Sequence, residues 1–337
     1  MERYLKLKKA HSIIERFETA KVLVIGDLIM DHFIWGKVKR ISPEAPVPVV
    51  EVTSESLMLG GSANVANNIH SLGGKALVTG IVGKDDDGKK LVAALKKKSI
   101  PTSGIIIDPK RPTTIKTRII AHSQQVVRFD REKSDKIESE TAEKVFNYLK
   151  KAIKEARVVV ISDYAKGLIT EALMDEVVHL CKKHSRPLAV DPKVEHFGFY
   201  TGATVVTPNN LEASLASGVD IKDQTSLHRA GELLYSKLGC EALLITRGEQ
   251  GMSLFEADSD THIPTVAKEV FDVSGAGDTV ISVLALALAS GANFKEAAVL
   301  ANFAAGIVVG KIGTATLTRD ELTNAVATGL KAWPKSN

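Results

Sequence analysis

The stretch 272-DVSGAGDTV-280 places Gly275, Ala276 and Gly277 directly before the carboxylate of Asp278, at the start of a long apolar run. Glycine costs about 1 kcal/mol relative to alanine in a helix interior, so two glycines here need another explanation. A Gly-Ala-Gly turn leaves backbone N–H groups unobstructed, and a following helix adds the positive end of its dipole. Such a turn could stabilise the charge of a transferring phosphoryl group, although Asp278 could equally be an ordinary acid in the first turn of a helix.

A second motif, 60-GGSANVANNIHSLGG-74, predicts a short helix that begins after a glycine pair and ends at another. The helix carries three asparagines, which are poor helix formers, so some of them are expected to face a polar ligand. Asn64, in the first turn after Gly61, is best placed to bind the hydroxyl groups of a sugar. An ordinary pair of helix caps is the alternative.

A third motif, 207-TPNNLEA-213, brings Asn209 and Glu212 onto one face of a turn at the end of a strand. Amide and carboxylate oxygens of this kind suit Mg²⁺, held through its water molecules. The alternative is a capping box, because Asn-x-x-Glu is also a common start of a helix.

Two common phosphate-binding motifs are absent from the sequence. A Rossmann fingerprint needs a third glycine where this chain has Val280, and the segment 306-GIVVGKI-312 lacks the spacing and the hydroxyl of a P-loop. Phosphate chemistry in this protein would therefore depend on another device.

Short apolar, β-branched runs that end in a polar residue alternate with helical patterns, which predicts an α/β fold with a doubly wound, mainly parallel sheet flanked by helices. Ligands of such sheets bind beyond the carboxyl ends of the strands, where this chain carries polar residues. These residues are Asp27, Asp163, Asp191, Asn209 and Thr246.

Two regions interrupt this alternation, at about residues 33–60 and 105–130. Both show alternating apolar residues, prolines and basic side chains, which predicts the strands of a small β-sheet lid inserted into a single domain spanning residues 1–337. The lid is rich in basic residues: Lys37, Arg40, Lys116, Arg118 and Arg128.

The charge and hydropathy of the chain exclude several classes of protein. A net charge of +4 on 337 residues makes no case for nucleic acid as a partner. The most apolar run, residues 280–289, is about half as long as a membrane span requires, and the N-terminus has no apolar core of a signal peptide. We therefore expect a cytoplasmic protein, with its two cysteines as buried thiols.

Four motifs occur in an order that resembles the ribokinase-like (PfkB) carbohydrate kinases over nearly the whole chain. They are the Gly-Gly…Leu-Gly-Gly segment of residues 60–74, Asn209-x-x-Glu212, Thr246-Arg-Gly-x-x-Gly251 and Asp272 to Asp278. The commonest form of the family has threonine where this chain has Ser274, and both residues carry a hydroxyl.

The resemblance implies roles for individual residues. Asp278 would be the catalytic base, beside an anion hole of amides at Gly275, Ala276 and Gly277. ATP and Mg²⁺ would be bound by the nucleotide and metal residues Asn209, Glu212, Thr246, Gly248 and Asn302. The sugar would be bound by Asp31, Gly61 and Asn64.

Further segments resemble the branch of this family that phosphorylates D-glycero-β-D-manno-heptose 7-phosphate at the anomeric hydroxyl, a step in ADP-heptose biosynthesis. They are residues 40–52, 122–130, 162–167 and 308–314. Arg118 and Arg128 would bind the phosphate of the sugar, because arginine can grip phosphate with two parallel bonds, and Lys193 is a further phosphate candidate.

Three points accompany this second resemblance. The chain lacks the His-x-Gly-His signature of the adenylyltransferase that is fused to many such kinases, so we expect no adenylyltransferase domain. Another sugar or sugar phosphate, such as ribose or fructose 6-phosphate, remains the alternative substrate. Lids of this family often pair, so we expect a homodimer through the lid.

Overall fold

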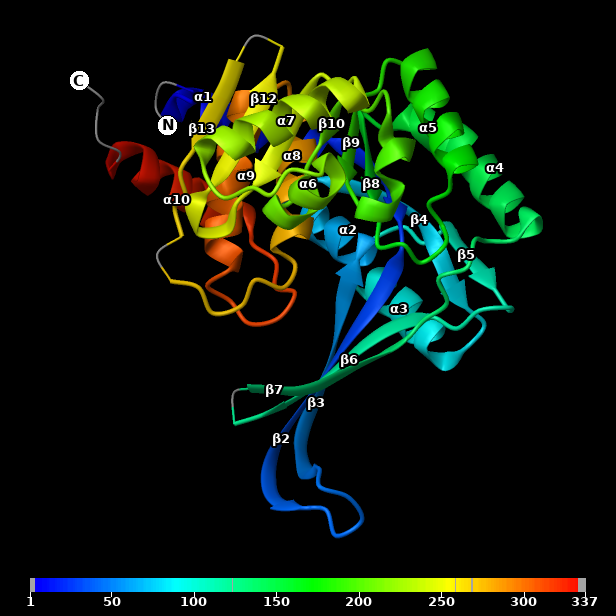
Figure 1. Ribbon diagram of the computed structural model, residues 1–337. Coiled ribbons are helices and arrows are strands. Elements are labelled where there is room, and N and C mark those ends of the chain that lie inside the picture. Colours follow the sequence, from blue (N-terminus) through cyan, green and yellow to red (C-terminus); the bar gives the residue numbers. More distant parts are fainter. Residues whose placement is uncertain (1–3, 123, 258, 268, 333–337) are drawn as a thin grey trace.

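A mainly parallel sheet forms the centre of the computed structural model, which describes residues 4–122, 124–257, 259–267 and 269–332 (Figure 1). The sheet has nine strands in the order β13-β12-β11-β10-β9-β8-β1-β4-β5. Neighbours from β11 to β5 run parallel, and β12 and β13 are antiparallel additions at one edge. The strands are β1 (Lys21–Gly26), β4 (Lys75–Gly83), β5 (Gly104–Asp108), β8 (Val158–Ser162), β9 (Leu188–Asp191), β10 (Val205–Val206), β11 (Ala242–Thr246), β12 (Met252–Glu256) and β13 (Ser259–Ile263).

Helices cover both faces of this sheet, because its strands are apolar on both sides. In β1, Val22 and Val24 belong to one buried cluster, whereas Leu23 and Ile25 belong to the other. The first cluster includes residues of α1 (Leu7–Glu15), α2 (Ser62–Ser71), α3 (Asp86–Lys97), α8 (Ala276–Ala289), α9 (Phe294–Val308) and α10 (Arg319–Ala332). The second includes residues of α4 (Ser139–Glu155), α5 (Glu171–Lys183), α6 (Asn210–Ser217) and α7 (Gln224–Leu238). The predicted doubly wound α/β fold is confirmed.

Three short 3₁₀ helices complete the described elements of this body. They are η1 (Arg16–Thr19), η2 (Val194–Tyr200) and η3 (Gly248–Gln250). Within the described residues, every helix is too short or too polar to cross a membrane.

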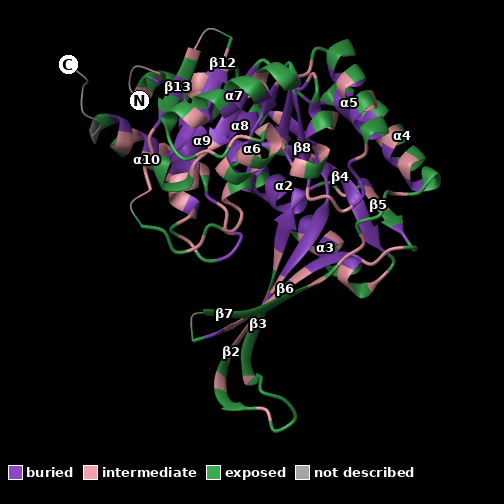
Figure 2. Cartoon of the chain, in the orientation of Figure 1, coloured by how far each residue is buried: buried purple, intermediate pink, exposed green. Residues whose placement is uncertain are grey.

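A second, four-stranded sheet projects from the body (Figure 1). Its order is β3-β2-β6-β7, formed by β2 (Leu28–Ile41), β3 (Pro48–Gly61), β6 (Thr114–Ala121) and β7 (Gln124–Arg131). Figure 2 shows that the outer end of this smaller sheet is mostly exposed, while burial is concentrated in the large sheet.

One boundary of the predicted lid is wrong. Residues 105–108 lie in β5, which pairs in parallel with β4 at the edge of the large sheet, and the smaller sheet resumes only at Thr114. The run of isoleucines in β5 is typical of a strand, but its side-chain pattern does not say which neighbouring strand it will pair with.

Candidate active site

The polar residues at the strand ends gather around one cavity of about 860 Å³. Asp163, Asp191, Asn209 and Thr246 line it, as the parallel topology predicts. Asp27 does not line the cavity. It is 5% exposed, and its carboxylate accepts hydrogen bonds from the backbone N–H groups of Tyr164 and Lys166.

The Asp278 carboxylate is buried beside the cavity and is held by two donors. Asn64 Nδ2 donates to Oδ2 and the hydroxyl of Tyr164 donates to Oδ1, both at 2.8 Å. Burial raises the pKa of Asp278 to about 7, although both hydrogen bonds oppose this rise. A carboxyl group with a pKa near neutrality is suited to accept a proton during turnover.

The turn before Asp278 requires glycine at Gly275, which caps the start of α8 in the left-handed region. Gly275 has φ of 76°, and a Cβ there would lie 2.9 Å from Asn64 Nδ2. Gly277 lines the cavity, and the nearest atom to a Cβ there would be Asp191 Oδ2, 3.9 Å away. The space beside Gly277 is therefore open to a ligand.

The predicted anion hole differs at Ala276. Its N–H donates to the carbonyl of Val273 at 3.2 Å, so it is already used within the turn. Among the described residues, the N–H groups of Gly275, Gly277 and Asp278 donate to no other protein group. These three amides, rather than that of Ala276, are the ones that remain for an anion.

Asn64 points at Asp278 and is fully buried, because α2 begins at Ser62, directly after Gly61, and packs against α8. Its side-chain oxygen accepts a hydrogen bond from Asn68 Nδ2 at 3.2 Å. The contacts observed for Asn64 are therefore with the protein, and its contact with a sugar stays a prediction. Gly61 has φ of 54°, and a Cβ there would lie 2.6 Å from the carbonyl oxygen of Asp27.

The smaller sheet brings charged side chains to one of its faces. Asp31 of β2, 4% exposed, pairs with Arg118 of β6, whose guanidinium lies 5.2 Å from the ring centre of Phe33. Arg128 of β7 has a half-exposed side chain and pairs with Asp130 at 3.2 Å. Arg118 is thus bound to Asp31, whereas the guanidinium of Arg128 remains accessible.

Two residues near Asp278 are missing from the predicted site. The ammonium of Lys116 lies 5.2 Å from the centre of the Tyr164 ring, and burial lowers the pKa of Lys116 while Asp31 opposes that shift. Among the described residues, Lys116 has no carboxylate partner within ion-pair distance. Tyr164 follows the polar end of β8 and lies within the segment 162–167 that resembles the heptose kinase branch, and these two signals could have identified it.

At the other end of the cavity, Asn209 and Glu212 form a capping box for α6. Each side chain accepts the backbone N–H of the other at 2.9 Å, so the structural alternative for this motif is realised. Both residues still line the cavity, and one oxygen of Glu212 remains outside the cap. Burial raises the pKa of Glu212, although the Asn209 N–H and Lys193 oppose the shift.

Asp191 adds a further carboxylate between Glu212 and Asp278. Its pKa lies well above the usual range, because desolvation and the nearby carboxylates of Asp278 and Glu212 disfavour its charged form. Crowded oxygens of this kind fit a hydrated divalent cation, which would relieve their mutual repulsion. Within the described residues no cluster of three or more His, Cys, Asp or Glu side chains could hold a metal ion unaided.

The remaining predicted residues line the same cavity. These are Lys193, Thr246, Gly248 and Asn302. The side chain of Asn302 donates to the carbonyl of Pro264 at 2.8 Å, and Gly248 opens η3 with φ of 56°.

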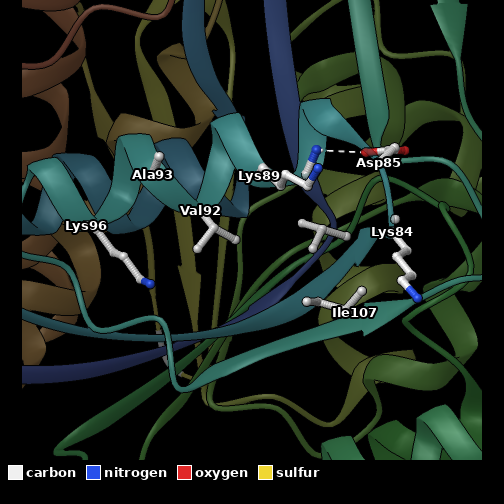
Figure 3. A pocket seen from close by; sticks show the side chains of 10 residues that line it. Lys84, Asp85, Lys89, Val92, Ala93, Lys96 and Ile107 are labelled. Atoms are coloured by element: carbon white, nitrogen blue, oxygen red, sulfur yellow. Dashed lines mark hydrogen bonds between the residues drawn. The ribbon is translucent and has the colours of Figure 1, made fainter.

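A separate hollow of about 310 Å³ lies between α3 and β5 (Figure 3). Lys84, Lys89 and Lys96 stand around its apolar floor of Val92 and Ile107. It contains no residue of the predicted site.

The fold resembles that of solved sugar kinases. The structure of Arabidopsis thaliana ribokinase complexed with ribose and ATP matches with a TM-score of 0.73 and 18% identity, covering 91% of this chain and 98% of that one. Phosphofructokinase-2 from Escherichia coli, in complex with substrates and products, matches with a TM-score of 0.74 and 19% identity over 92% of this chain and 99% of that one.

Residues 19–321 match the model of the family described as "pfkB family carbohydrate kinase", and the chain belongs to that family. Among curated relatives, bifunctional protein HldE of Geobacter sulfurreducens is 46% identical over 96% of this chain and 66% of its own length. The corresponding protein of Citrifermentans bemidjiense is 47% identical over 97% of this chain and 67% of its own length. The chain thus spans about two thirds of the length of these relatives.

Proposed function

We propose that this carbohydrate kinase transfers the γ-phosphoryl group of ATP to the anomeric hydroxyl of D-glycero-β-D-manno-heptose 7-phosphate, giving the 1,7-bisphosphate for ADP-heptose biosynthesis. One observation carries the proposal. The Asp278 carboxylate is buried next to Gly277 of the cavity lining, and the charges of Asp31 and Lys116 on the smaller sheet act on it. The heptose assignment is supported by the four segments of its branch and by the 46% identity to bifunctional protein HldE.

In this proposal Asp278 is the base. It accepts the proton of the sugar hydroxyl as that oxygen attacks the γ-phosphorus, and the bond from phosphorus to the leaving oxygen of ADP breaks. Because burial raises the pKa of Asp278 to about 7, the carboxylate can hold this proton at neutral pH and then release it.

The amides of Gly275, Gly277 and Asp278 would stabilise the negative charge on the transferring group, because they point from the positive end of α8 and have no partner among the described residues. Asp191 and Glu212 would hold hydrated Mg²⁺, together with Asn209, and the ion would neutralise phosphate charge when bound. Thr246, Gly248, Asn302 and Lys193 would line the site of the nucleotide.

The smaller sheet would close over the sugar as a lid. Asp31 would accept hydrogen bonds from sugar hydroxyls, with Gly61 and Asn64 beside it. Arg128 and Lys116 are the best candidates for the phosphate of the substrate. The guanidinium of Arg118 is largely buried against Asp31, whereas the side chain of Arg128 is half exposed beside Asp130. This assignment keeps Arg128 from the two arginines that the sequence predicts and puts Lys116 in the place of Arg118.

We further propose that a second copy of the chain covers the other face of the smaller sheet. Across the sheet, Leu57 lies opposite His32, His32 opposite Thr117, and Thr117 opposite Phe129. Since neighbouring residues of a strand alternate between faces, this row lies opposite the row that contains Asp31 and Lys116. Phe129 and Leu57 are 55% and 47% exposed, and β3 and β7 are open edges, so pairing in a homodimer would cover them.

A substrate panel tests the assignment. The protein is incubated with ATP, Mg²⁺ and each of heptose 7-phosphate, fructose 6-phosphate and ribose, and ADP release is measured. We expect the highest kcat/KM for heptose 7-phosphate. A clear preference for ribose or fructose 6-phosphate would overturn the heptose assignment while leaving the carbohydrate kinase intact.

A further inference from the structure

Tyr164 contacts both the proposed base, Asp278, and the proposed phosphate ligand, Lys116. Its hydroxyl donates to Asp278 Oδ1 at 2.8 Å, and the ammonium of Lys116 lies over its ring, 5.2 Å from the ring centre. We infer that Tyr164 is a positioning residue that orients the carboxylate of Asp278 through its hydroxyl and the ammonium of Lys116 through its ring. This inference rests on the proposed function, in which Asp278 is the base and Lys116 binds the sugar phosphate.

The backbone around Tyr164 is fixed by buried carboxylates. Asp27 accepts the N–H groups of Tyr164 at 2.9 Å and of Lys166 at 3.1 Å. Asp163 accepts the N–H of Ala165 at 2.8 Å, and Ala165 has φ of 53°, a conformation that non-glycine residues rarely adopt. A conformation of this kind persists only where the surroundings over-determine it.

Asp163 is itself anchored from a different part of the chain. Its Oδ2 accepts hydrogen bonds from the hydroxyl of Tyr200 and from Nδ1 of His196, both at 2.7 Å. The segment that carries Tyr164 is therefore tied to β1 through Asp27 and to η2 through Asp163. The ring and hydroxyl of Tyr164 are consequently held in one place before any substrate binds.

The hydroxyl leaves Asp278 in a defined orientation. Asn64 holds Oδ2 and Tyr164 holds Oδ1, so the carboxylate cannot rotate without breaking both hydrogen bonds. The charged groups that face it are Asp31 from β2, Lys116 from β6 and Asp191 from β9. A hydrogen bond to an ionised carboxylate stabilises the charged form, so its loss favours protonation.

Two substitutions separate the hydroxyl from the ring. Tyr164→Phe removes the hydrogen bond and keeps the ring. The acidic limb of the plot of kcat/KM against pH should therefore move to higher pH by about one unit, which lowers kcat/KM about tenfold at pH values below the limb. Its KM for the sugar phosphate at pH 9 should stay within about twofold. Tyr164→Leu removes both interactions and should also raise that KM, because Lys116 loses its support.

Tyr148→Phe is the matched control, because Tyr148 lies on α4 against Gly104, away from the cavity. It should leave both the pH profile and KM unchanged. Tyr164→Phe with an unshifted limb would overturn the role of the hydroxyl, and an unchanged KM in Tyr164→Leu would overturn that of the ring. If Asp278→Asn kept full turnover, the proposed base itself would be wrong, which distinguishes the two failures.

Discussion

The activity of this kinase should fall as the pH drops through about 7. Burial raises the pKa of Asp278 to about 7, and only the ionised carboxylate can accept the proton of the sugar hydroxyl. With that pKa, roughly one eleventh of the protein carries the carboxylate at pH 6 and roughly ten elevenths at pH 8. Because Asp278 is ionised only above its raised pKa, kcat/KM should rise about tenfold from pH 6 to pH 8.

The assay is ADP release at limiting sugar phosphate, with ATP and Mg²⁺ in excess, between pH 6 and pH 9. The phosphate of the substrate also titrates near pH 6, so the base needs to be separated from it. Asn64→Ala provides this separation, because it removes the donor to Asp278 Oδ2 and leaves the substrate unchanged. We expect its limb to move to higher pH. A flat profile from pH 6 to pH 8, or the same limb in Asn64→Ala, would refute the reasoning.

Four further substitutions test the turn before Asp278, the phosphate site and the proposed dimer interface. Gly275→Ala puts a Cβ 2.9 Å from Asn64 Nδ2 at φ of 76°, so it should lower the free energy of unfolding by about 1–3 kcal/mol in denaturant titrations. Gly277→Ala puts a Cβ 3.9 Å from its nearest atom, so this variant should keep wild-type stability but lose kcat. The reverse order of stabilities would contradict the described turn. Lys116→Met should raise KM for a phosphorylated sugar more than for ribose, and an equal effect on both would remove Lys116 from the phosphate site. Phe129→Asp should convert the expected dimer to a monomer in light scattering, and a dimer that persists would place the interface elsewhere.

The layers and the strand ends could be predicted because their signals are local. A buried β-branched run that is followed by a polar residue, such as the run before Asp163, indicates a parallel strand and the edge of the sheet at which that polar side chain lies. The segment 105–108 has the same signal, but its partner strand β4 is defined only by packing. The boundary of the smaller sheet was therefore predicted incorrectly at that point.

The contacts within the site were less accessible from the sequence. Asn64 was expected to face a sugar, yet the direction of α2 turns its amide toward Asp278, and that direction depends on the packing of α2 against α8. Lys116 lies on β6 of the smaller sheet and Tyr164 follows β8 of the large sheet, yet the two side chains meet in the folded chain. The spacing of these residues along the chain does not indicate that contact.

The central claim is that Asp278 is the base of a sugar kinase that acts on heptose 7-phosphate. The most direct measurement follows ADP release and the ³¹P NMR signal of a new phosphate at the anomeric carbon, for the wild type and for Asp278→Asn. We predict the 1,7-bisphosphate from the wild type, and a rate about 10²–10⁴-fold lower from a variant that still melts cooperatively. Normal turnover by Asp278→Asn would contradict the account.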